Sequence, residues 1–199
     1  MADKETISVY DNEVEAYAKI ADTDSLLISL NNFISAVSSG GKVLDLGCGP
    51  GNASAHMRRH GFQVDPVDAS SEMVKLANTT YDIDARVAMF DDLDAENQYD
   101  GIWANFSLLH ATKEDFPKHL KQVYDALKPS GVFHIGMKLG DGSKRDRLGR
   151  FYAYYTLEEL IHNLETIGLG VFAKTTGEEV GLAGDLSPYA IILSRKPGL

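Results

Sequence analysis

The chain has 199 residues, 44% of them hydrophobic and 24% charged, and this balance predicts one globular domain and excludes a disordered or fibrous protein. Nineteen Lys and Arg residues against twenty-nine Asp and Glu residues give a formal net charge of -10, which repels nucleic acid and anionic membranes, so we expect neither as a partner. The single cysteine excludes an intramolecular disulfide, and no stretch resembles a secretion signal or a membrane span, so we expect a cytoplasmic protein.

The N-terminal part of the chain has apolar residues at helical spacing. This spacing predicts one or two amphipathic helices between residues 13 and 36, which the run SSGG at residues 38–41 ends. We expect residues 1–199 to form a single domain, with residues 1–40 as an N-terminal helical cap and residues 41–199 as its core.

From residue 42 onward, short apolar segments alternate with helical patterns. Strands are expected near residues 42–46, 63–67, 85–89, 101–105 and 132–137, and helices near residues 70–79 and 113–127. Such an alternation is typical of an α/β fold, in which a parallel sheet is covered by helices on both faces.

The C-terminal part changes this pattern. Thr156, with Glu159 three residues later, is a capping-box start for a helix that reaches about Ile167. Two strands near residues 169–175 and 189–194 follow without a helix between them, so we expect an antiparallel hairpin at the end of the sheet.

Three glycines at alternate positions, Gly47, Gly49 and Gly51, follow the first predicted strand. A glycine-rich turn at this place lets a ligand approach the backbone closely, because no Cβ stands in the way. A dinucleotide fingerprint would have its third glycine where Asn52 stands, so the spacing disfavours a pyrophosphate ligand.

The segment DLGCGPG at residues 45–51 resembles the first motif of the class I S-adenosylmethionine-dependent methyltransferases. Three further motifs follow in the order typical of that family, and the resemblance covers roughly residues 13–196. It implies a Rossmann-like, seven-stranded, mostly parallel sheet with the last strand antiparallel and an N-terminal helical cap. Within the family, the chain is most similar to small bacterial enzymes of the tellurite-resistance and ubiquinone-biosynthesis-like types.

An acidic residue also follows the second predicted strand. Asp68 lies 21 residues after Gly47, where sheets of this kind present a carboxylate to the two hydroxyls of a ribose. The same spacing fits a nicotinamide-dinucleotide enzyme, and Asp68 is also a candidate helix N-cap, a position that Ser70 could equally fill.

The resemblance implies which residues hold S-adenosylmethionine. In the third motif, the acid and leucine that contact adenine correspond to Asp92 and Leu93; Asp91 remains an alternative, as does a solvated acidic loop. The complete set of donor-binding residues that we expect is Tyr17, Asp45, Gly47, Cys48, Gly49, Asp68, Ala69, Met73, Asp92, Leu93, Ala104 and Asn105.

Candidate residues for the methyl acceptor come from two places. His110 follows the fourth predicted strand and has an ordinary pKa near neutrality, so it is a candidate proton acceptor, although a structural role is the alternative. The basic segment after the fifth strand offers Arg145, Arg147, Arg150 and Tyr152, which suggests a small anionic acceptor; surface ion pairs are the alternative explanation.

The expected activity is transfer of a methyl group from S-adenosylmethionine to a small molecule, which releases S-adenosylhomocysteine. A bound donor is already activated, so we expect neither a metal nor a covalent intermediate. Two alternative hypotheses are a regulatory module that binds the donor without turnover and an NAD(P)-dependent reductase. The oligomeric state and the identity of the acceptor are left open.

Overall fold

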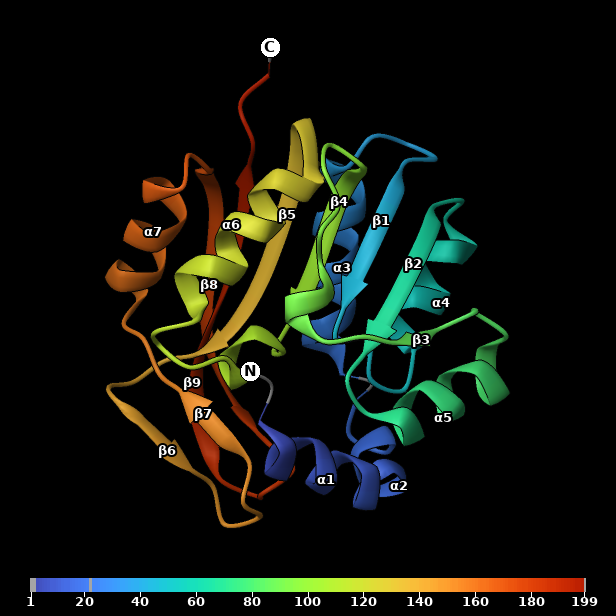
Figure 1. The fold of residues 1–199 in the computed structure, drawn as a ribbon, viewed down its shortest axis with the longest axis vertical. Helices are drawn as coiled ribbons and strands as arrows, with labels where there is room; N and C mark the ends of the chain where they lie inside the picture. Colours follow the sequence, from blue (N-terminus) through green and yellow to red (C-terminus); the bar gives the residue numbers. More distant parts are fainter. Residues whose placement is uncertain (1–2, 22, 199) are drawn as a thin grey trace.

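A computed structural model describes residues 3–21 and 23–198. Seven strands form one sheet in the order β3-β2-β1-β4-β5-β9-β8 (Figure 1). Their bounds are β1 (Lys42–Leu46), β2 (Gln63–Asp68), β3 (Arg86–Val87), β4 (Tyr99–Asn105), β5 (Leu127–Lys138), β8 (Gly170–Val180) and β9 (Leu186–Arg195). Strand β9 pairs antiparallel with both of its neighbours, whereas the other pairs are parallel. The predicted Rossmann-like sheet with an antiparallel last strand is confirmed.

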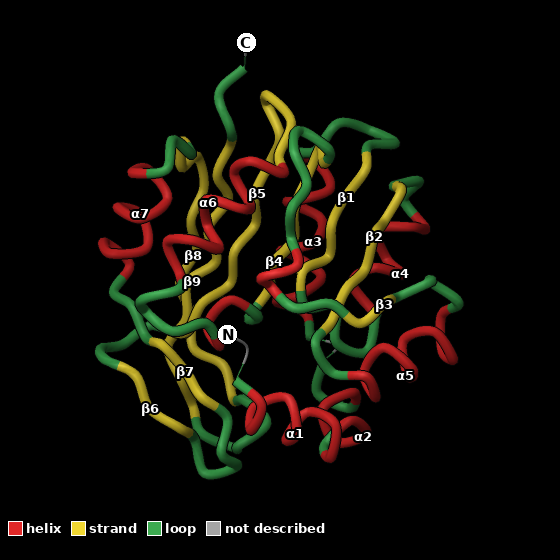
Figure 2. The backbone as a smooth tube through the Cα atoms, viewed as in Figure 1, coloured by secondary structure: helices red, strands yellow, loops and turns green. Residues whose placement is uncertain are grey.

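Helices cover both faces of this sheet, as Figures 1 and 2 show. The helices α6 (Phe116–Ala126) and α7 (Leu157–Thr166) lie in front of it, and α3 (Asp24–Ala36) and α4 (Asn52–Arg59) lie behind it. Helix α5 (Ser71–Tyr81) contacts α4 and β2. The capping box at the start of α7 is present, with Thr156 and Glu159 each bonded to the backbone of the other.

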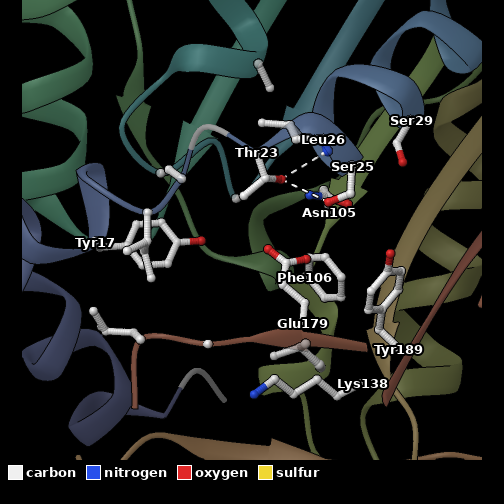
Figure 3. Close-up of a pocket in the computed structure, with 18 of the residues that line it drawn as sticks. Tyr17, Thr23, Ser25, Leu26, Ser29, Asn105, Phe106, Lys138, Glu179 and Tyr189 are labelled. Atoms are coloured by element: carbon white, nitrogen blue, oxygen red, sulfur yellow. Dashed lines mark hydrogen bonds between the residues drawn. The ribbon is translucent and has the colours of Figure 1, made fainter. Parts of the chain in front are cut away.

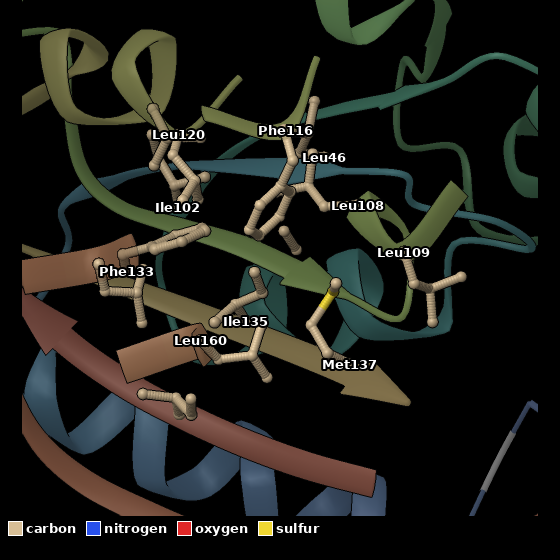
Figure 4. Packing of buried hydrophobic residues seen from close by; sticks show 14 of the residues in the cluster. Leu46, Ile102, Leu108, Leu109, Phe116, Leu120, Phe133, Ile135, Met137 and Leu160 are labelled. Carbon is tan, nitrogen blue, oxygen red and sulfur yellow. The ribbon is translucent and has the colours of Figure 1, made fainter. Parts of the chain in front are cut away.

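Each face of the sheet has its own buried core. On the α6 side, Ile102 and Phe133 pack with Phe116, Leu120 and Leu160 (Figure 4). On the α3 side, the buried cluster contains Leu30, Phe33, Met57 and Trp103. Side chains that alternate between the two faces of each strand supply both cores, so the strands are rigidly placed and their carboxyl ends form a fixed edge.

Two short helices lie across this carboxyl edge. These are α1 (Lys4–Asn12) and α2 (Val14–Ala18), below the arrowheads of β1 and β2 in Figure 1. Helix α3 does not share this position, because its Leu30 and Phe33 are buried against the sheet. The packing therefore separates α1 and α2 from the rest of residues 1–40.

Several elements differ from the sequence-based expectation. Helix α1 lies before the predicted helical region and begins where the Asp3 side chain accepts a hydrogen bond from the Thr6 amide. Helix α4 was not predicted, because its polar sequence NASAHMRR gives few apolar positions to read. Strand β3 has only two residues, both exposed, and the chain then turns into a short 3-10 helix at residues 90–92.

Among the described residues, no helix is both long and apolar enough to cross a membrane.

The turn after β1 provides a test of why glycine is needed there. Gly51 has a φ of +86°, and a Cβ on it would lie 2.7 Å from Ile83 Cδ1 and 2.8 Å from Ala77 Cβ. Gly61 has a nearly equal φ of +87° with no atom within 4 Å of that position. We expect Gly61→Ala to lower the free energy of unfolding by about 1–2 kcal/mol, because alanine disfavours the left-handed backbone. Gly51→Ala should lower it by about 1–3 kcal/mol more, because its Cβ would also overpack the site.

Urea unfolding followed by the fluorescence of the single tryptophan measures both variants. Equal losses of stability would show that backbone conformation, and not packing against α5, selects glycine at position 51.

Candidate active site

Two adjoining cavities open at the carboxyl edge of the sheet, where β1 and β4 are neighbours although they are not consecutive in the chain. Such a topological switch point is where open α/β sheets bind ligands. The β2-side cavity is lined by Asp68, Met73 and His110, and the β5-side cavity by Asp45, Lys138 and Glu179. Residues that line both are Tyr10, Tyr17, Gly47, Gly49, Asn105 and Phe106.

The glycine turn forms the floor between the cavities. Gly47 has a φ of +89°, and a Cβ on it would come within 2.4 Å of Ser107 Cβ, so only glycine fits. A Cβ on Gly49 would point toward the ring of Tyr17, at 3.5 Å from Cε1, and would fill the space between the turn and the cap. The glycines thus leave bare backbone facing the cavities.

Asp45 is a buried carboxyl group on β1, where it is 1% exposed. Burial raises its pKa to about 7; the nearby Asp68 acts in the same direction, and a hydrogen bond from Ser54 acts against both. Ser54 Oγ donates that bond to Asp45 Oδ2 over 2.6 Å. Near neutral pH this group is therefore poised between its two protonation states, and a nearby cation would favour the charged one.

Asp68 joins the end of β2 to the glycine turn. Its two carboxylate oxygens accept hydrogen bonds from the Gly49 amide and the Ser70 amide, each over 2.8 Å. The N-cap of α5 is Ser70, whose hydroxyl accepts from the Met73 amide, so Asp68 does not serve as the N-cap. Burial raises the pKa of Asp68, and the side chain lines the β2-side cavity.

The two adjacent aspartates point in different directions. Asp91 lines the β2-side cavity and also pairs with Lys118 over 2.6 Å. Asp92 turns back to accept from the Met89 amide over 2.8 Å, and neither it nor Leu93 is among the described residues that line the two cavities. The 3-10 turn at residues 90–92 causes this difference, because it rotates successive side chains by about a third of a turn.

Ala104 also departs from the expected set. It is fully buried in the core on the α6 side, whereas Trp103 and Asn105 line the β5-side cavity. Neighbouring residues of a strand point to opposite faces, so Ala104 must face away when Trp103 and Asn105 face the cavity. The sequence-predicted residues that the structure does bring to the cavities are Tyr17, Asp45, Gly47, Cys48, Gly49, Asp68, Ala69, Met73, Asn105, His110, Arg150 and Tyr152.

His110 is held in one orientation by two hydrogen bonds. Its Nδ1–H donates to the Phe151 carbonyl oxygen over 2.6 Å, and its Nε2 accepts from the Tyr10 hydroxyl over 2.9 Å. Burial is the main cause that lowers the pKa of His110, to about 4. The imidazole is therefore neutral at physiological pH, and its free lone pair is directed to Tyr10.

Arg150 completes this network from the β5 side. It is 2% exposed and donates to the Asp146 carboxylate through Nε at 2.9 Å and Nη2 at 2.6 Å. Its Nη1 donates to the Tyr10 hydroxyl over 3.1 Å, and its guanidinium lies 5.3 Å from the ring centroids of both Tyr10 and Tyr152. The charge of Arg150 is thus satisfied within the protein.

The other two candidate arginines, Arg145 and Arg147, line neither cavity. They belong to the hairpin of β6 (Ser143–Arg145) and β7 (Phe151–Ala153), two strands that the sequence pattern does not predict. Arg145 pairs with Asp3 and Glu5 of the N-terminal segment. Arg147 is exposed and lies against the β8–β9 turn, 2.8 Å from where a Cβ on Gly184 would be. The prediction that these arginines face an acceptor does not agree with their positions.

These contacts hold α1 over the site from two sides. The Phe151 amide donates to Thr6 Oγ1 over 2.8 Å, and Arg145 donates to Asp3 over 2.8 and 3.0 Å. On the other side, Ser70 Oγ donates to Asp11 over 2.6 Å. Helix α1 is therefore attached to both the β6–β7 hairpin and α5.

Asn105 is oriented from behind by a buried histidine. His134 Nε2–H donates to Asn105 Oδ1 over 3.0 Å, and its ring stacks on Trp103 with centroids 3.5 Å apart. Asn105 lines both cavities, and with its oxygen engaged in this way its side chain still has an NH₂ group that can donate to a ligand.

Several residues that line the β5-side cavity are not predicted from the sequence. Lys138 ends the apolar strand β5, and a charged residue at the carboxyl end of a buried strand is a signal that could have identified it. Glu179 and Tyr189 reach the cavity from the β8–β9 hairpin, where no local pattern marks them. Among the described residues, no group of three or more His, Cys, Asp and Glu side chains is placed to hold a metal ion.

The raised pKa of Asp45 predicts how stability depends on pH. Folding raises this pKa from 3.8 to about 7, so the folded state binds an extra proton in that interval and the free energy of unfolding falls as the pH rises through it. Relative to Asp45→Asn, the free energy of unfolding of the wild type should fall by at most roughly 4 kcal/mol between pH 4 and pH 8.

Urea unfolding at a series of pH values measures this difference, and Asp94→Asn, at an exposed position outside both cavities, is the matched control. A difference between Asp45→Asn and wild type that stays constant with pH would contradict the assignment.

Comparisons with known proteins agree with this geometry. The family model described as a methyltransferase domain matches residues 43–131. An uncharacterized methyltransferase of Staphylococcus carnosus is 26% identical over 132 residues, which are 66% of this chain and 64% of that protein. A ubiquinone biosynthesis O-methyltransferase of Xanthomonas campestris is 33% identical over 103 residues, which are 48% of this chain and 42% of that protein. The chain thus matches less than two thirds of the length of either relative.

A solved structure shows the same fold over nearly the whole chain. It is that of the Burkholderia thailandensis 1,6-didemethyltoxoflavin-N1-methyltransferase with bound 1,6-didemethyltoxoflavin and S-adenosylhomocysteine. The TM-score is 0.74 at 22% identity, and the match covers 96% of this chain and 88% of that one. The resemblance to the class I S-adenosylmethionine-dependent methyltransferases is therefore confirmed, and it is carried in the sequence by residues 43–131, which match the methyltransferase domain model.

Proposed function

We propose that the chain is an S-adenosylmethionine-dependent methyltransferase that acts as a single domain on a small-molecule acceptor and releases S-adenosylhomocysteine. The observation that carries this proposal is the bare glycine turn between two cavities, with the carboxyl groups of Asp45 and Asp68 on either side of it. The matched methyltransferase domain and the ligands of the solved relative support it.

The residues present fit the donor chemically. The β2-side cavity offers a carboxylate for the ribose hydroxyls in Asp68 and an apolar surface for adenine in Met73. Asp91, which lines this cavity, is in our proposal the acid that accepts from the adenine amine, in place of Asp92. On the other side of the turn, Asp45 and the backbone at Gly47 and Cys48 would receive the ammonium group of the methionine part.

Bound S-adenosylmethionine would supply a methyl group on a positively charged sulfur, ready for transfer to a nucleophilic atom. The protein then has to align the acceptor and exclude water. We assign water exclusion to Tyr10 and Tyr17, whose rings meet edge to face at 5.4 Å and line both cavities. Asn105, also at the junction, would orient the reacting groups.

The proposed role of His110 follows from its hydrogen bonds. A histidine whose pKa is near 4 is a weak base, and its Nε2 faces the Tyr10 hydroxyl instead of open cavity. A proton from an acceptor would therefore reach His110 only through Tyr10. We propose that His110 mainly positions Tyr10 in the closed cap.

The nicotinamide alternative has an obstacle in the structure. A pyrophosphate would lie at the N-terminus of α4. There the Asn52 side chain donates to the Ala21 carbonyl oxygen over 3.2 Å, so the segment after α2 is tied to the first residue of α4.

Calorimetric titration with S-adenosylmethionine, S-adenosylhomocysteine, NADH and NADPH tests the donor assignment. We expect the two sulfur ligands to bind, and Asp68→Asn to weaken them about 10- to 100-fold, because a hydrogen bond to a charged group contributes about 1.5–3 kcal/mol. Asp91→Asn should weaken binding more than Asp92→Asn, its matched neighbour. Thermal unfolding of each variant controls for loss of folded protein.

The outcome that contradicts the proposal is binding of a nicotinamide cofactor without either sulfur ligand. Donor binding with no turnover on a broad acceptor panel would instead favour a regulatory module.

Donor binding should also release protons. At pH 6.5 the carboxyl group of Asp45 is largely protonated, because burial raises its pKa to about 7. An ammonium group beside it would lower that pKa again. Titrations with S-adenosylhomocysteine in two buffers of different ionisation enthalpy measure the release, which should disappear in Asp45→Asn. Equal release by wild type and variant would place the ammonium group elsewhere.

A further inference from the structure

The β5-side cavity extends beyond the glycine turn into a region that the donor residues do not occupy. Its walls there come from β5 and from the β8–β9 hairpin (Figure 3). Phe106 and Tyr189 meet edge to face at 5.7 Å, and Leu182 and Ile191 add apolar surface. This part of the cavity therefore offers flat, apolar walls.

A lysine provides a positive charge in this region. Lys138 is half-buried at the carboxyl end of β5, with its Nζ 4.7 Å from the ring centroid of Tyr152. A Cβ on Gly181 would lie 3.2 Å from that Nζ, so the ammonium group rests against the backbone of the β8–β9 turn. Within the described residues, no carboxylate lies within 4.0 Å of it. Burial, and after it the charge of Arg150, lowers the pKa of Lys138.

A glutamate provides a negative charge in the same region. Glu179 is half-buried on β8, and its carboxylate points into the cavity (Figure 3). Burial raises its pKa, whereas a hydrogen bond from Ser25 and the charge of Lys138 act in the opposite direction. Lys138 and Glu179 thus line one cavity and influence each other electrostatically without forming a direct ion pair.

Two half-buried charges that do not pair with each other retain part of their desolvation cost, which a complementary ligand can offset. Arg150 cannot play this part, because Asp146 already neutralises it. A ligand with one negative and one positive group would form a charge-assisted hydrogen bond at each of the two side chains.

We infer that the methyl acceptor is a small amphoteric molecule with a flat apolar body, whose anionic group binds Lys138 and whose ammonium or other N–H group binds Glu179. This inference rests on the proposed function, since it assumes that the donor occupies the glycine turn and leaves the β5-side region to the acceptor.

The test uses three probes that share a benzene ring: 3-(aminomethyl)benzoate carries both charged groups, benzoate carries only the carboxylate, and benzylamine carries only the ammonium group. Each is titrated against protein saturated with S-adenosylhomocysteine, with binding followed by ligand-observed NMR. For the wild type we expect the zwitterionic probe to bind at least about five-fold more tightly than either singly charged probe, because only it satisfies both side chains.

Substitutions assign each charge to a residue. Lys138→Met should weaken 3-(aminomethyl)benzoate and benzoate about ten-fold and leave benzylamine unchanged. Glu179→Gln should weaken 3-(aminomethyl)benzoate and benzylamine and leave benzoate unchanged. The matched controls, Lys174→Met and Glu178→Gln, change exposed residues of β8 outside the cavity and should leave all three probes unaffected.

The affinity of each variant for S-adenosylhomocysteine separates this inference from the proposed function. If S-adenosylhomocysteine binds normally but the probes show no charge preference, or the cavity variants behave like their controls, the inference is overturned while the proposed function stands. If S-adenosylhomocysteine does not bind the wild type, both are overturned.

Discussion

The hydrogen bond from the Gly49 amide to Asp68, 2.8 Å long, joins the ends of two neighbouring parallel strands. It fixes the glycine turn relative to β2, and a second bond from the Ser70 amide to the same carboxylate fixes the start of α5. The glycine turn, the Asp68 carboxylate and the start of α5 are therefore connected directly to one another. Because the donor would lie across all three, its geometry depends on this single carboxylate being in place before the ligand arrives.

The position of α1 at the cavities depends on a chain of hydrogen bonds between buried polar groups. Asp146 neutralises Arg150, Arg150 donates to the Tyr10 hydroxyl, and that hydroxyl donates to His110. Each polar group is satisfied by the next, so the network can be buried at the junction of the cavities without an isolated charge. It also links α1 to the β6–β7 hairpin, through Phe151 as well as through Arg150. Helix α1 is therefore held at the cavities by interactions on both of its sides.

Local patterns predicted the sheet well, because a buried parallel strand must be apolar whatever its neighbours are. The bounds of β1 agree with the prediction, and the glycine turn and Asp68 stand where their spacing placed them. The misplaced residues depend on contacts that spacing does not encode. The family resemblance indicates Asp92, but a 3-10 turn directs its side chain away from the cavity, and Arg145 pairs with Asp3, which is 142 residues away in the chain. Glu179 reaches the site from β8, the edge strand of the sheet beside β9, and this placement depends on the pairing of distant strands.

Whether a cationic side chain near the proposed acceptor region can bind a ligand therefore depends on its ion pairs, and not on how many cations the segment contains. The basic segment at residues 144–150 has four cations in an acidic protein, yet Arg145 and Arg150 are neutralised by nearby aspartates. Lys138 is a less conspicuous residue in the sequence, but it lies against backbone and an aromatic ring. An ammonium group held in this way keeps its capacity to bind an anion, and Glu179 across the same cavity restricts that anion to molecules that also carry a donor group. Selectivity for an amphoteric acceptor then arises because Lys138 and Glu179 line the same cavity without forming an ion pair with each other.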